Sequence, residues 1–228
     1  MRDFSKAISS SVERELKKHS FEKKNEFFNW EINDETRGLI ALDRIPYKQK
    51  NAFGIAVGVG VINIIVQNIV SEFLGQENLK DLATISNGLS YLMPEHRWKE
   101  WAFRQSDAND SVIIDMMSAI TKYGIPWMKR LSNMEAQIQE LESKPWAING
   151  SERFDLPVLY LLKGNKDRAV EFTRNVIDTT NQYQPPNVGK IFAPVFEVIT
   201  PPSNHSKFAG KLLEVYEPFA KKVAEYRG

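Results

Sequence analysis

The 228-residue chain contains no cysteine and only three histidines. The absence of cysteine excludes a disulfide framework, a cysteine-based zinc site and a thiol nucleophile. Three histidines scattered along the sequence argue against an imidazole-based metal site, so we expect no metal ion. These histidines are His19, His96 and His205.

An excess of charge of one sign is also missing, because 30 Lys and Arg residues oppose 29 Asp and Glu residues. The formal net charge of +1 gives the whole chain no attraction for a polyanion such as nucleic acid. The apolar fraction of 42% and the aromatic fraction of 11% are those of a folding chain. We therefore expect a buried core and regard nucleic acid as a poor candidate for the partner.

Signatures of common catalytic sites are absent as well. The sequence has no H-E-x-x-H zinc motif, no G-x-S-x-G nucleophile turn and no Walker A phosphate loop. It therefore indicates no catalytic residue and no cofactor, and it favours a non-enzymatic protein without excluding an enzyme.

One uncharged run, Ala52–Val70, has about the length of a membrane span. Its first part, Phe53–Val61, alternates large apolar residues with Gly and Ala, and its second part, Ile62–Leu74, has apolar residues at helical spacing. This division predicts a strand followed by an amphipathic helix and no membrane span. Residues 1–18 carry scattered charges and no apolar signal-peptide core, so we expect a cytoplasmic protein.

Strand-like alternation is confined to the first half of the chain. A helix over residues 4–18 precedes a predicted hairpin that turns at Asn33-Asp34, and further strands are predicted over 82–93 and 101–104. Strands followed by helices indicate the α+β class, here a mainly antiparallel sheet with packed helices and then a helical C-terminal sub-domain.

After residue 107 the spacing of apolar residues is helical throughout. Gly124 is predicted to end one helix, and Ser132-Asn-Met-Glu135 has the pattern of a capping box that begins another. We expect an α+β sub-domain over 1–106 and a helical sub-domain over 107–228, together forming one compact unit. The segment 185–205 has no assignable pattern.

Two short motifs are candidates for binding. Gly58-Val-Gly60-Val-Ile-Asn63 follows a predicted strand and precedes a helix, as a dinucleotide-binding turn does. Asn63 occupies the position where such a turn needs Gly or Ala, and hairpin strands precede the motif, unlike in a Rossmann sheet. A smooth strand face against which a helix packs is the favoured interpretation, and a nucleotide-binding enzyme is the alternative.

The second motif is Tyr91–Arg104, in which aromatic residues alternate with cations. Trp and Arg anchor many protein interfaces, whereas aromatic and basic residues together also bind nucleic acid. Because two tryptophans three residues apart can point into a core, we expect at least one of them to be buried. The candidate binding residues are Arg97, Trp98, Trp101 and Arg104.

Four segments resemble the bacterial domain-of-unknown-function family numbered 4304. They are Leu16–Lys24 leading to Phe28-Asn-Trp30, the strand Phe53–Val59, the block Ser90–Pro94 with the tryptophans after it, and Leu156–Gly164. Ser20 stands where that family usually has Gly, and the chain after Pro185 has no counterpart. The resemblance implies a sheet with a helical end. It brings no established reaction, and some members look like immunity or accessory proteins beside bacterial toxins.

These observations together favour a module that binds another macromolecule, and a protein partner is the expected one. The two alternatives are a nucleotide-binding enzyme that uses Gly58 and Gly60, and a nucleic-acid binder that uses the Arg/Trp segment 97–104.

Overall fold

The computed structural model describes residues 2–49, 51–143, 152–182 and 205–227. Internal contacts divide the chain into two units, Met1–Gln67 with Lys80–Ser143, and Asn68–Leu79 with Lys144–Gly228. The helices that follow residue 107 are thus shared between the units, whereas the sequence pattern placed 107–228 together.

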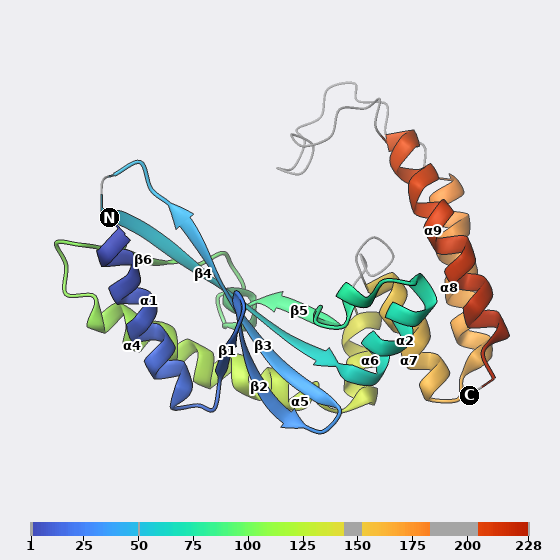
Figure 1. The fold of residues 1–228 in the computed structure, drawn as a ribbon, viewed down its shortest axis with the longest axis horizontal. Helices are drawn as coiled ribbons and strands as arrows, with labels where there is room; N and C mark the ends of the chain where they lie inside the picture. The colour runs from blue at the N-terminus through green and yellow to red at the C-terminus, as the bar shows by residue number, and fades with distance from the viewer. Residues whose placement is uncertain (1, 50, 144–151, 183–204, 228) are drawn as a thin grey trace. The chain divides into compact units, whose positions relative to one another are not determined.

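The first unit is built on a six-stranded antiparallel sheet (Figure 1). Four strands follow one another as a meander, and β3 and β4 are paired over eleven consecutive residue pairs, from Thr36↔Asn63 to Pro46↔Phe53. The strands are β1 (Glu22–Lys24), β2 (Phe27–Asn33), β3 (Thr36–Pro46) and β4 (Ala52–Asn63). This arrangement confirms the predicted hairpin and the strand over 53–61.

The other edge of β4 is shared by two short strands. β5 (Ile85–Gly88) pairs with Gly58–Val61, and β6 (Trp101–Arg104) pairs with Ala52–Ile55. The strand β6 was predicted with these bounds. The strand predicted over 82–93 is wrong in its extent, because the chain turns into the helix α3 (Leu89–Leu92) directly after Gly88.

On the outer edge of β6, the side chain of Asn109 takes the place of a neighbouring strand. Its Oδ1 accepts a bond from the Arg104 backbone N–H at 3.2 Å, and its Nδ2 donates to the Arg104 carbonyl at 2.9 Å. Asn109 directly precedes α4 (Asp110–Ala119), but its side chain makes no capping bond to that helix.

Helices of the first unit pack on one face of the sheet. The Phe4 ring of α1 (Arg2–Lys17) lies 5.6 Å from the Phe53 ring, and Ile8, Val12 and Leu16 of the same helix are buried. The helix α4 packs beside α1. After it come η2 (Ile120–Gly124), α5 (Ile125–Arg130) and α6 (Met134–Glu142).

Two predicted helix boundaries in this stretch are wrong. Gly124 ends no helix, because η2 is a π-helical turn that continues into α5. A Cβ at position 124 would lie 3.3 Å from both Leu89 Cδ1 and Val59 Cγ1, so close packing explains the glycine. The cap of α6 is Asn133 and not Ser132, since the Asn133 side chain accepts the N–H groups of Glu135 and Ala136.

The helix α2 (Ile64–Leu74) begins directly after β4, as the change of period predicted. Asn63 caps it, because its Oδ1 accepts the Val66 N–H at 3.1 Å. Its Nδ2 donates to Gln137 at 3.0 Å, and its backbone N–H donates to Thr84 Oγ1 at 2.9 Å. The buried Asn63 side chain thus accepts a backbone N–H in the first turn of α2 that has no acceptor within the helix.

The described part of the second unit is helical. It contains the end of α2, η1 (Glu77–Leu79), α7 (Glu152–Leu162), α8 (Lys166–Gln182) and α9 (His205–Glu225). Its core includes Tyr216 and Phe219, whose rings pack on Phe154, and the Tyr216 hydroxyl donates to the Arg153 carbonyl at 2.9 Å.

The sheet and helices confirm the α+β class. Within the described residues, no helix is long and apolar enough to cross a membrane. The segment 185–205 lies outside the described residues apart from its last residue.

Candidate functional site

The four predicted binding residues all lie in the first unit, where the chain passes from α3 to the end of β6. Trp101 is 3% exposed and belongs to the core, whereas Trp98 is 59% exposed. Arg97 and Arg104 are exposed. This confirms the expectation that at least one of the two tryptophans is buried.

The carboxylate of Asp115 on α4 holds the chain on the C-terminal side of Trp98. Its Oδ2 accepts a bond from Trp101 Nε1 at 2.8 Å and one from Lys99 Nζ at 2.9 Å. The Lys99 ammonium also lies 4.9 Å from the centre of the Trp101 ring. The bond from Lys99, more than that from Trp101, lowers the pKa of Asp115 and keeps it ionised.

A second anchor holds the N-terminal side of Trp98. His96 has a φ of 45°, in the left-handed region that a side chain rarely adopts. Its Nδ1 lies 2.8 Å from the Tyr91 carbonyl oxygen, which can only accept, so we assign the ring proton to Nδ1. Its backbone N–H donates to the Met93 carbonyl at 3.1 Å. Trp98 therefore lies between two fixed points.

A hollow of about 400 Å³ lies beside the exposed indole. This volume is at the lower end of the range of small-ligand and side-chain pockets. Ser90 and Met93, which line it, are buried. The other lining residues are Glu95, Arg97, Trp98 and Lys99.

The structure separates the four predicted residues into two groups. Arg97 and Trp98 line the hollow, while Trp101 and Arg104 do not. Arg104 instead forms an ion pair with Asp107 at 3.6 Å, and its backbone bonds to Asn109. Only Arg97 and Trp98 are thus placed to act together on a partner.

Gly58 and Gly60 do not form the strand-to-helix turn that a nucleotide site requires. Both lie inside β4, where Gly58 is opposite Ala41 and Gly88, and Gly60 is opposite Leu39 and Ser86. The helix begins only at Ile64, and Asn63 caps it as described above. Neither glycine therefore stands at a helix N-terminus.

The packing around these glycines also differs from the expected helix packing. A Cβ at Gly60 would meet the Ile85 carbonyl oxygen at 3.0 Å, and one at Gly54 would meet the Tyr47 hydroxyl at 2.9 Å. These atoms belong to segments beside β4, whereas the Phe4 ring of α1 packs on Phe53, which lies on the opposite face of the strand. Gly54 and Gly60 therefore allow close approach by neighbouring backbone and side chains, whereas a Cβ at Gly58 would make only an ordinary contact with Ala41.

Sequence reasoning missed a hydrogen bond across Gly54, from the Tyr47 hydroxyl to the Glu100 carboxylate. Burial, and then the bond to Glu100, raise the pKa of Tyr47 to about 12. Tyr47 therefore stays protonated at neutral pH and cannot serve as a base. Because 53 residues separate the partners, no local pattern signals this bond.

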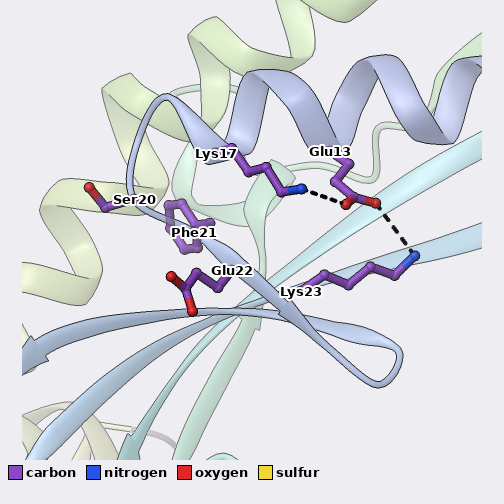
Figure 2. A pocket seen from close by; sticks show the side chains of 6 residues that line it. All are labelled: Glu13, Lys17, Ser20, Phe21, Glu22 and Lys23. Atoms are coloured by element: carbon purple, nitrogen blue, oxygen red, sulfur yellow. Dashed lines mark ion pairs between the residues drawn. The ribbon is translucent and has the colours of Figure 1, made fainter.

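A smaller hollow of about 350 Å³ lies between α1 and β1 (Figure 2). Glu13 accepts ion pairs from Lys17 at 3.0 Å and from Lys23 at 3.7 Å, while Ser20 and Glu22 extend away from these pairs. The bond from Lys17 lowers the pKa of Glu13. Lys17 and Lys23 are both paired with Glu13, so neither ammonium in this hollow is free to bind an anion.

Among the described residues, no three His, Asp or Glu side chains are grouped so that they could hold a metal ion. Comparisons of the chain with protein-family models, with curated proteins and with solved structures found no match. The resemblance to the family numbered 4304 therefore stays a prediction.

Proposed function

We propose that the protein is a binding module for another protein and that Trp98 is the anchor of its binding surface. The observation that carries this proposal is the exposure of 59% of a tryptophan between two anchored points of the chain. A binding residue in a segment that is held on both sides before binding costs less conformational entropy in a complex than one in a free loop. Tryptophan is also among the residues most often found at interface hot spots.

The charges of the same segment favour a protein partner over nucleic acid. Lys99 is bound by Asp115 and Arg104 pairs with Asp107, so Arg97 is left as the cation beside Trp98 without an ion pair among the described residues. A nucleic-acid groove needs several free cations along a backbone and several stacking rings. Here Trp101 is buried, and one exposed indole with one free cation suits a protein surface better.

The position of Gly58 and Gly60 inside β4, and not at a helix N-terminus, weakens the case for a nucleotide-dependent enzyme. A non-enzymatic protein-binding role, in the cytoplasm, is thus our preferred function. It is compatible with the accessory or immunity role that the family resemblance implies.

The proposal is tested in cells by placing a photo-crosslinking amino acid at position 95, which lines the same hollow and leaves Trp98 in place, and by identifying the protein that it captures. The captured protein is then purified and titrated calorimetrically against the wild-type protein and the variants W98A and I114A. Ile114 is 68% exposed on α4 and is the matched control. We expect W98A to weaken binding by about tenfold or more, and I114A to leave it unchanged.

Equal affinities of wild type and W98A would refute the proposal. A salt-dependent affinity for oligonucleotides that W98A abolishes would replace it with the nucleic-acid alternative.

A further inference from the structure

The hollow beside Trp98 is lined by one carboxylate, that of Glu95, and one guanidinium, that of Arg97, neither of which is paired within the described part of the chain. Within the described part of the chain, Glu95 and Arg97 form no ion pair with each other or with any other residue. The third charged residue of the hollow, Lys99, is bound by Asp115 at 2.9 Å. The charges available to a partner are therefore one carboxylate and one guanidinium, separated by a single residue in the sequence.

The apolar part of the hollow's lining is formed by Trp98 and Met93. Trp98 is exposed, and Met93 in the lining is 9% exposed, so an apolar side chain entering the hollow would contact both an indole and a thioether. The flexible Met93 side chain can adapt to the shape of the entering group. Burying that apolar group against Trp98 and Met93 removes apolar area from water and so favours binding.

We propose, on the basis of the function proposed above, that the hollow recognises a short protein segment in which an apolar residue is next to a single acidic residue. The apolar side chain contacts Trp98 and Met93, and the carboxylate pairs with Arg97. An Arg–carboxylate pair can form two parallel hydrogen bonds, which adds geometric specificity to the charge attraction.

Glu95 gives this recognition a direction. A second carboxylate near Glu95 meets a like charge, so a run of acidic residues or a phosphate backbone is disfavoured, and a basic or neutral residue is accepted there. The segment therefore binds in one orientation, with its acidic residue at Arg97.

The test is a selection of random linear peptides displayed on phage against the purified full-length protein. Enriched peptides are synthesised and titrated against wild type, W98A, R97E, R97Q and the exchange variant E95R/R97E. Positions 95, 97 and 98 are all exposed, so we expect the variants to keep the melting temperature of the wild type. Ile114→Ala again serves as the control for a change on an unrelated exposed surface.

We expect enriched peptides to combine an apolar residue with one Asp or Glu and to bind W98A about tenfold more weakly. R97E should weaken the same peptides by about tenfold, R97Q by less, and a Lys in place of the peptide's acid should restore binding to R97E. The exchange variant should prefer peptides with the charge order reversed.

Peptides that depend on Trp98 but tolerate R97E would overturn this inference and leave the proposed function intact. Peptides that bind W98A as well as wild type would overturn both. The failure of any peptide to be enriched would overturn this inference alone, because the proposed function is decided by the affinity of W98A for the captured protein.

Discussion

Trp98 and Trp101 belong to one short motif, yet Trp101 is almost completely buried and Trp98 is mostly exposed. Trp101 is the first residue of β6, where alternate side chains, Trp101 and Phe103, point into the core. Trp98 precedes the strand, and the hydrogen bonds of His96 and Lys99 fix the chain on both sides of it, so that its indole lies outside the core. The same residue type is thus a core residue in one position and a candidate contact for a partner in the other.

The difference shows that composition alone does not define a binding surface. A tryptophan becomes available to a partner when the backbone around it is fixed by other residues and its own ring is not required for packing. The predictions below test this division between the two tryptophans.

The largest effect is expected for Trp101→Ala. Removal of a buried indole leaves a cavity and a carboxylate without one of its donors, so we expect the free energy of unfolding to fall by about 3–5 kcal/mol. Urea denaturation measures the loss. Trp101→Phe retains most of the packing and should cost clearly less, and similar losses for both variants would contradict a packing role.

A smaller effect is expected for Asn109→Ala, which removes the side chain that closes the edge of β6. The backbone groups of Arg104 lose two hydrogen bonds, and we expect destabilisation of about 1–2 kcal/mol. Hydrogen exchange should be faster at the Arg104 amide than in wild type. Unchanged exchange at this amide would show that Asn109 does not protect the strand.

Asp115→Asn probes the anchor shared by Lys99 and Trp101. Because Asp115 is largely exposed and water screens the pair, we expect a loss below about 1 kcal/mol at neutral pH. The pKa of Asp115 is lowered in the folded protein, so its stabilisation is present above the unfolded value of about 3.9 and is lost as the pH falls through the folded pKa. Urea denaturation at neutral pH and at about pH 3 should show that the free energy of unfolding falls less on acidification in the variant than in the wild type.

The smallest effect on stability is expected for Trp98→Ala, within about 0.5 kcal/mol of wild type. Acrylamide quenching of tryptophan fluorescence should decrease in this variant, because an exposed indole has been removed. A loss of stability comparable with that of Trp101→Ala would erase the distinction between the two residues.

Much of the fold was predictable because periodicity changes sharply along the chain. The change after Val61 predicted both β4 and α2, and the alternation of Trp101 and Phe103 predicted β6. The errors arose where tertiary packing overrides a local signal. Gly124 has the residue type of a helix end but is selected by its contact with Val59 and Leu89.

The site was predictable only in part. Spacing identified Arg97 and Trp98 together with Trp101 and Arg104, but it could not separate them, because their exposure depends on where β6 begins. The anchor at Asp115 lies 14 residues from Trp101 on another element, and the Tyr47–Glu100 bond spans 53 residues. Such contacts require the assembled sheet.

The pairing of β6 with the first four residues of β4 also constrains the order of folding during synthesis. The hairpin of β3 and β4 can form as soon as Asn63 has left the ribosome, but β6 is made only after α2, β5 and α3. Until then, the edge of β4 at Ala52–Ile55 has no partner strand. A nascent chain paused before Trp101 therefore presents an open apolar strand edge, which favours aggregation.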